Sequence, residues 1–139
     1  MALNLDFEFE YQLLPVVAVV FVSPQTGARV EAEALIDTGA EGTLLDASIA
    51  VDLGIDLEVG DAVQIGGVGG TLGEARVADV EIFFSERPDL RAVVKAAFAP
   101  NVAADYGNLL GLNVLSFFDF ALSHTNRLGY LGRAAPAQP

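Results

Sequence analysis

The sequence predicts a mainly β domain, built as a closed barrel or a sandwich, from three observations. Apolar and polar residues alternate with a period of two in several segments, as in strands that have one buried face. Glycine- and proline-rich turn signals separate these segments at short intervals. Hydrophobic residues make up 53% of the 139 residues, which is enough for the core of one domain. No linker or repeat is visible, so we expect a single domain over residues 1–131 and a flexible tail over 132–139.

The first quarter of the chain predicts three strands. Aromatic and acidic residues alternate over residues 5–12, which predicts a half-buried strand. Residues 16–22 are β-branched and apolar on both faces, so they predict a more central strand. A Pro/Gly turn at 23–27 leads into a third alternating segment that ends at Ile36. The last two strands therefore form a hairpin that leads directly into Asp37.

The middle of the chain predicts a short strand over 43–45 and then a short amphipathic helix. Asp46 is a plausible N-cap for this helix, and Gly54 ends it after Leu53. Extended stretches over 62–65 and 72–84 flank four glycines within residues 66–70, which predicts a mobile hairpin tip. A polar turn over 85–89 precedes an apolar strand over 92–99.

The last third predicts a polar loop over 101–107 and a short apolar strand, Asn108–Leu110, that closes on Gly111. Residues 112–117 can form one or two helical turns. Two strand-like segments follow, 118–122 and 128–131, and a polar turn joins them. His124 in this turn is the only histidine and has no spaced partner, so we expect no metal or triad role for it.

Charge and composition exclude several classes of function. The formal net charge is −12, and no cluster of Lys and Arg occurs, which argues against a nucleic-acid or anionic-membrane surface. The chain has no cysteine, so disulfides, thiolate metal sites and a cysteine nucleophile are excluded. The longest apolar run covers about ten residues, short of the roughly 20 needed to span a bilayer. With no basic signal-peptide start either, we expect a soluble and, by default, cytoplasmic protein.

Asp37 stands in the most unusual position of the sequence. An apolar strand delivers this carboxylate into the tight turn Asp37-Thr38-Gly39-Ala40. Asp, Thr and Gly are also common turn residues, so the tripeptide alone leaves an ordinary polar turn equally open.

Three features in order resemble the retropepsin-like aspartic peptidases, the family of the retroviral proteases and their bacterial and eukaryotic relatives. They are Asp37-Thr38-Gly39-Ala40 after an apolar strand, the glycine-rich hairpin at 65–70, and Leu109-Leu110-Gly111 before a short helix. The similarity spans roughly residues 13–131 and implies a closed barrel with a flap hairpin and one or two short helices.

The resemblance also implies a role for each matching residue. Asp37 matches the catalytic aspartate, Thr38 the residue whose hydroxyl ties two active-site turns together, and Gly39 the residue whose main chain runs against the substrate. Leu109-Leu110-Gly111 matches the segment that supports the active-site turn. Residues expected to touch substrate are in the turn and the flap: Ala40, Glu41, Ile65, Gly66, Gly67, Val68 and Gly69. Leu45 is a further candidate for a pocket wall.

A homodimer follows from the same comparison. Hydrolysis of an amide needs one group that takes a proton from water and one that donates a proton. Two adjacent carboxylates sharing one proton supply both groups, without a metal or other cofactor. The chain has a single Asp-Thr-Gly, and Asp52-Leu53-Gly54 lacks the hydroxyl, so the second carboxylate must come from another chain.

The sequence departs from the retroviral pattern at the dimer contacts. Those enzymes carry an Arg after the late Gly that pairs with acidic residues after the motif, whereas Leu112 follows Gly111 here. Glu41 keeps the acid, and Asn113 stands where the family often has Asn or Asp. The chain ends also differ from the retroviral ones, which knit into a sheet between subunits.

Three functions are therefore open. The first is an aspartic endopeptidase that acts on peptides or proteins as a homodimer. The second is an inactive retropepsin-like module for peptide binding or dimerisation. The third is an acidic, all-β structural protein in which Asp37 is only a turn residue.

Overall fold

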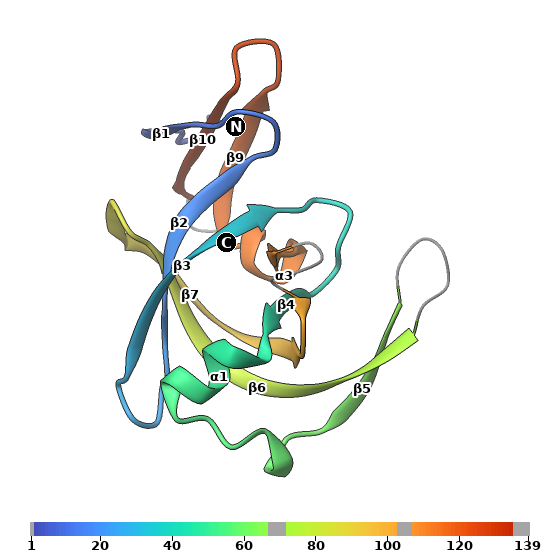
Figure 1. Cartoon of the computed structure of the whole chain (residues 1–139). Helices are drawn as coiled ribbons and strands as arrows, with labels where there is room; N and C mark the ends of the chain where they lie inside the picture. The colour runs from blue at the N-terminus through green and yellow to red at the C-terminus, as the bar shows by residue number, and fades with distance from the viewer. Residues whose placement is uncertain (1, 67–71, 103–106, 135–139) are drawn as a thin grey trace.

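The structure is a computed structural model that describes residues 2–66, 72–102 and 107–134 of the chain (Figure 1). Its main body is a closed barrel of six strands, which pair in the ring order β2-β3-β8-β4-β7-β6 and back to β2. The six are β2 (Val16–Val22), β3 (Arg29–Ile36), β4 (Thr43–Asp46), β6 (Leu72–Phe84), β7 (Arg87–Ala99) and β8 (Asn108–Leu110). The predicted mainly β, barrel-type fold is confirmed.

The barrel closes through β2, which pairs with β3 along its whole length and with β6 over Val19–Val22. Both edges of β2 are therefore occupied, as the sequence predicts for a central strand, although Ala18 on its outward face is exposed. The interior holds large apolar side chains; Phe21, Phe84 and Phe98 are each at most 1% exposed.

A long hairpin extends from the barrel. β5 (Ala62–Gly66) pairs antiparallel with the first part of β6, and Figure 1 shows the two strands reaching away from the body of the molecule. The predicted hairpin is thus present up to Gly66 and from Leu72, and its tip lies outside the described residues.

In the part of the chain that the structure describes, two short α-helices and one 3-10 turn accompany the barrel strands. α1 (Ala47–Leu53) starts where the Asp46 carboxylate accepts a hydrogen bond from Ser48 N–H, and it ends at Gly54 with φ of 69°. Both ends agree with the sequence prediction. The 3-10 turn η1 (Leu57–Val59), capped by Asp56, was not predicted, and α3 (Leu112–Leu115) follows Gly111. No helix in the described ranges is long and apolar enough to cross a membrane.

The two ends of the chain form a second, three-stranded sheet in the order β1-β10-β9, with β1 (Phe7–Glu10), β9 (Phe118–Ser123) and β10 (Leu128–Arg133). Phe7, Phe9 and Tyr11 lie on its buried face, and Phe9 packs where a Cβ on Gly129 would stand. The alternation in the sequence correctly predicts which residues of β1 are buried. The partner strand of β1 is β10, more than a hundred positions away in the sequence.

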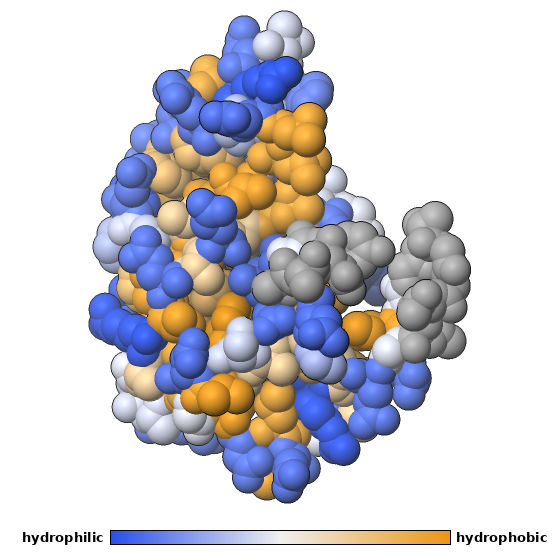
Figure 2. All heavy atoms as spheres, viewed as in Figure 1, coloured by the Kyte–Doolittle hydropathy of each residue, from blue (hydrophilic) through white to orange (hydrophobic). Residues whose placement is uncertain are grey.

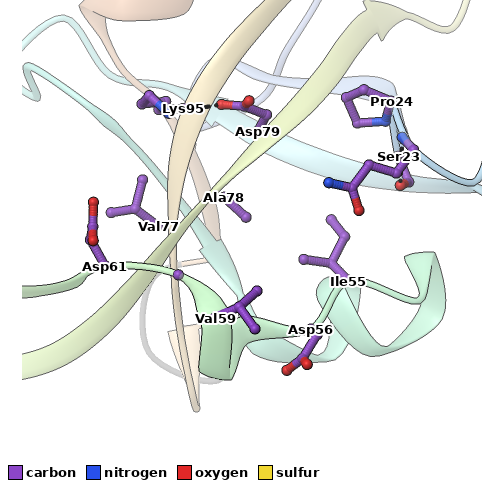
Figure 3. Close-up of a pocket in the computed structure, with 12 residues that line it drawn as sticks. Ser23, Pro24, Ile55, Asp56, Val59, Asp61, Val77, Ala78, Asp79 and Lys95 are labelled. Carbon is purple, nitrogen blue, oxygen red and sulfur yellow. Dashed lines mark hydrogen bonds and ion pairs between the residues drawn. The ribbon is translucent and has the colours of Figure 1, made fainter.

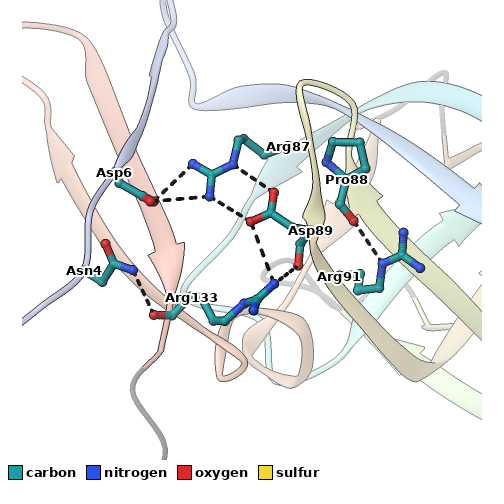
Figure 4. A network of polar contacts seen from close by, with 7 residues as sticks. All are labelled: Asn4, Asp6, Arg87, Pro88, Asp89, Arg91 and Arg133. Carbon is teal, nitrogen blue, oxygen red and sulfur yellow. Dashed lines mark hydrogen bonds and ion pairs between the residues drawn. The ribbon is translucent and has the colours of Figure 1, made fainter.

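An ion-pair network holds this terminal sheet against the β6–β7 turn (Figure 4). The Arg87 guanidinium binds Asp6 from the N-terminal segment at 3.1 Å and Asp89 at 2.9 Å. Arg133, the last residue of β10, donates to the main-chain oxygen of Asp89 at 3.2 Å. We call these four residues, Asp6, Arg87, Asp89 and Arg133, the terminal latch.

Four predicted boundaries need correction. The first strand is shorter than the predicted 5–12, because only Phe7–Glu10 pair with β10. The polar turn at 85–89 is narrower, because β7 already starts at Arg87 and a bulge opposite Phe83 and Phe84 takes up the extra residues. The helical segment after Gly111 ends at Leu115 rather than at 117. β10 continues to Arg133, past the predicted end of this strand at 131, because Gly132 and Arg133 pair with β9.

Candidate active site

The Asp37 turn begins where two parallel strands end side by side. β3 and β8 pair in parallel with Ile36 opposite Leu110, and the Asp37 N–H donates to the Leu110 carbonyl at 3.0 Å. Ile36 and Leu110 are buried in the barrel core, with 4% and 0% exposure. The apolar strand before Asp37 therefore fixes the backbone of this residue to a rigid part of the fold.

The Asp37 carboxylate is half-buried and is oriented within its own turn. Its Oδ1 accepts a hydrogen bond from Gly39 N–H at 2.9 Å. The main-chain carbonyl of Asp37 accepts a second one from Ala40 N–H at 3.3 Å. Thr38 and Gly39 are exposed beside it. The turn thus holds the Asp37 carboxylate in a fixed position next to two exposed residues.

A clamp of neutral hydrogen bonds supports the turn from behind. The Thr43 hydroxyl is buried, donates to Asn113 Oδ1 at 2.8 Å and accepts from Gly111 N–H at 3.1 Å. Leu112 N–H donates to the Ala40 carbonyl at 2.8 Å, and Asn113 N–H donates to the next carbonyl at 3.1 Å. The start of α3 is therefore tied to the active-site turn by both side chains and main chain.

Gly111 sits at the tightest point of this clamp. A Cβ at this position would lie 2.1 Å from the Gly42 carbonyl oxygen and 2.8 Å from that of Ala40. These are backbone atoms that cannot move without moving the turn, so only glycine fits here. This contact explains physically the predicted supporting role of Leu109-Leu110-Gly111.

Asn108 is a supporting residue that sequence reasoning missed. Its side chain is buried, donates to the Glu33 carbonyl at 3.1 Å and accepts from Asp46 N–H at 2.9 Å. It therefore links β3 to the end of β4 across β8. A polar residue at the start of an otherwise apolar strand was the only signal for it.

Glu41 lies at the exposed end of the turn. Its carbonyl accepts the Asn113 N–H, which fixes its backbone, while its carboxylate makes no ion pair with any other described residue.

The predicted substrate residues of the hairpin are only partly described. Ile65 and Gly66 belong to β5, while Gly67, Val68 and Gly69 lie outside the described residues. Half-buried Ile65 packs in a small cluster that contains Val63 and Leu44 from β4. This cluster connects the hairpin to the strand that follows the Asp37 turn.

Leu45 is not a pocket wall. It is 0% exposed in the main core, whereas its neighbour Leu44 faces the hairpin cluster. In β4 the inward positions are Thr43 and Leu45, so alternation places Leu44 on the opposite face. Once the structure shows that Thr43 is buried, the alternation along β4 assigns the outward-facing position to Leu44.

A groove of about 310 Å³ lies elsewhere, between η1 and the β6–β7 pair (Figure 3). Its wall includes Asp56, Asp61 and Asp79, with the last bound to Lys95 at 3.2 Å. None of the predicted site residues lines it. Within the described ranges, no group of His, Cys, Asp or Glu is arranged to hold a metal ion.

A six-stranded barrel with an Asp-Thr-Gly turn at the end of parallel strands, clamped by a glycine from a later strand, defines the aspartyl-protease class of protein. A model of the family described as gag-polyprotein putative aspartyl protease matches residues 26–117, more than half of the chain. The chain belongs to this retropepsin-like family of aspartyl proteases. The comparison with curated proteins gave no match.

Proposed function

We propose that the protein is an aspartic endopeptidase that acts as a homodimer, with Asp37 of each copy contributing one carboxylate. The observation that carries the proposal is the position of Asp37. Its backbone is bonded to β8, its carboxylate accepts from Gly39 N–H, and the Thr43–Gly111–Asn113 clamp supports the turn.

The chemistry needs two carboxylates that share one proton. The ionised Asp37 takes a proton from water, whose oxygen attacks the carbonyl carbon of the peptide bond. The protonated Asp37 of the other copy donates to the carbonyl oxygen, which gives a tetrahedral intermediate. Transfer of a proton to the amide nitrogen then breaks the C–N bond and releases two peptides. All atoms come from water and the substrate, so no cofactor is required.

The substrate is a peptide or protein segment that lies extended beside the turn. The main-chain carbonyl of Gly39, which accepts no hydrogen bond from a described residue, is available to the substrate backbone, and Glu41 lies further along the same turn. Leu44 and Ile65 form an apolar wall under the hairpin. The hairpin residues Gly66, Gly67, Val68 and Gly69 form a flap over the bound peptide in this proposal.

A mixed peptide library tests the activity from about pH 3 to about pH 7. We expect cleavage at peptide bonds flanked by apolar residues, with an acidic optimum, because one of the two carboxylates must keep its proton. The matched control is Asp37→Asn, which keeps the size of the side chain and the bond to Gly39. Cleavage that survives in this variant would contradict the assignment.

The second candidate function is an inactive module that binds peptides or dimerises. Leu112 favours it, because the Arg that braces the retroviral dimer is missing and Glu41 has no ion pair among the described residues. A statine-type inhibitor separates the two, since such compounds bind tightly only where a working carboxylate pair has formed. Tight binding that is lost in Asp37→Asn supports the enzyme, and the absence of binding supports the module.

A further inference from the structure

We propose that three exposed leucines beside the active-site turn, Leu13, Leu14 and Leu112, form an apolar contact with a second copy of this chain. We call them the leucine rim. The inference rests on the proposed function, because it identifies the surface that completes the active site. It replaces the ionic bracing of the retroviral enzymes with burial of apolar side chains.

Leu13 and Leu14 lie in the loop between β1 and β2, next to Asp37. β2 and β3 pair with Val16 opposite Leu35, and Ile36 N–H donates to the Pro15 carbonyl at 3.0 Å. This antiparallel register brings Leu14, the residue before Pro15, alongside Asp37. The two leucines are nevertheless 75% and 53% exposed. Figure 2 shows a hydrophobic area on the face where Figure 1 has this loop.

Leu112 reaches the turn from a different segment of the chain, the start of α3. Its N–H donates to the Ala40 carbonyl at 2.8 Å, so the first residue of α3 is fixed to the turn, yet its side chain is 45% exposed. Two separate segments therefore present large apolar side chains to solvent. The segment with Leu13 and Leu14 is bonded to Ile36, just before the turn, and Leu112 is bonded to the turn itself. Burial of such side chains in a contact is favourable.

The rim is uncharged in a chain with a net charge of −12. Its sequence neighbours Gln12, Pro15 and Asn113 are uncharged as well, and the acidic residue bonded beside it is Glu41, whose carbonyl accepts the Asn113 N–H. Two copies can therefore meet here without placing the bulk of their acidic side chains against each other. In a two-fold dimer, the rim of one copy faces the same surface of the other, so a single neutral apolar patch is sufficient.

The last strand, β10, does not offer an equivalent contact. β10 has β1 on one side and β9 on the other, so both of its edges are occupied within the chain. The terminal latch fixes this arrangement to the β6–β7 turn. Pairing of β10 with a strand of a second chain would require one of these pairs to break.

Sedimentation of the double variant Leu14→Asp/Leu112→Asp tests the rim. We expect its dimer dissociation constant to rise at least about a hundredfold, because each dimer would bury four uncompensated carboxylates. The control is Val51→Asp on α1, whose side chain is as exposed as Leu13, at 77%. Circular dichroism checks that both variants keep the fold. A dimer unchanged by the double substitution, or weakened equally by Val51→Asp, would overturn the proposal.

Ionic strength gives a second readout. An apolar contact between two acidic chains should tighten as salt rises from about 50 mM to about 500 mM, because salt screens their repulsion. A dimer held by ion pairs would weaken over the same range. Weakening by salt, or a monomer under all conditions, would also overturn the rim.

The Asp37→Asn variant separates this inference from the proposed function. If Asp37→Asn forms a dimer that the rim substitutions dissociate, the rim is supported even if no peptide is cleaved. If the wild-type chain cleaves peptides and the rim substitutions change neither cleavage nor dimerisation, the enzyme stands and the rim is wrong.

Discussion

The active-site turn and the terminal sheet are built on different physical principles. The turn is held by neutral hydrogen bonds and a glycine contact within the segment 26–117 that matches the protease family. β1, β9 and β10 all lie outside that segment, and their sheet combines aromatic packing with the ion pairs of the terminal latch. We infer that the support of the Asp37 turn does not depend on charge, whereas the attachment of the terminal sheet does.

The largest expected effect comes from Gly111→Ala. The new Cβ would lie 2.1 Å from the Gly42 carbonyl oxygen. This oxygen belongs to the backbone, so relieving the clash requires a shift of the turn. We expect a loss of about 3 kcal/mol or more in the free energy of unfolding, measured by denaturant titration. The matched control is Gly42→Ala, because nothing lies within 4 Å of a Cβ at that position. Gly42→Ala should change stability by less than about 0.5 kcal/mol; equal effects would contradict the clamp.

Thr43→Val should have the next largest effect. Valine keeps the shape but removes the hydroxyl, which leaves the Gly111 N–H and Asn113 Oδ1 without their partner. We expect a loss of about 1–3 kcal/mol, together with reduced peptide cleavage because the turn is less well fixed. Thr43→Ser keeps the hydroxyl and should retain most of the stability and most of the peptide cleavage. If Thr43→Ser is as damaging as Thr43→Val, the methyl group rather than the hydrogen bonds matters.

The smallest effect is expected at the terminal latch and should depend on pH. Hydrogen bonds from Arg87 lower the pKa of Asp89 from its usual 3.8 to about 2. Because the carboxylate is favoured in the folded state, its stabilising effect is present above pH 3.8 and is lost as the pH falls through about 2. Asp89→Asn should therefore lower the melting temperature slightly at about pH 6, and the difference from wild type should vanish near pH 2.

Salt should also reduce the effect of Asp89→Asn, since these side chains are partly exposed. The control is Asp52→Asn on the exposed face of α1. A difference at Asp89 that persists unchanged below pH 2, or an equal one at Asp52, would show that the latch does not act through charge.

The sequence was sufficient where structure is local. Alternation located nearly every strand, and Asp46 and Gly54 marked the two ends of α1, because strand periods and helix caps depend on neighbouring residues. Long-range pairing was different. The contact of β1 with β10 depends on Phe9 packing over Gly129, which no local pattern encodes.

The same limit applies to the candidate site. The Asp37 turn was found from its motif, whereas Asn108 and the Thr43–Asn113 bond emerge only when β8 comes to lie between β3 and β4. The prediction of Leu45 as a pocket wall was wrong by one position, since Leu44 is the residue that faces the hairpin cluster. A strand shifted by one position presents the opposite face, and the burial of Thr43 sets which face that is.

The central claim is that one active site requires Asp37 from two chains, and mixing wild type with Asp37→Asn tests it most directly. Chains are mixed in equal amounts, at constant total concentration, under conditions that allow subunits to exchange. If two intact copies are required, one quarter of the dimers carry both carboxylates, and about a quarter of the activity should remain. If each chain acts alone, about half of the activity would remain, which would contradict the account.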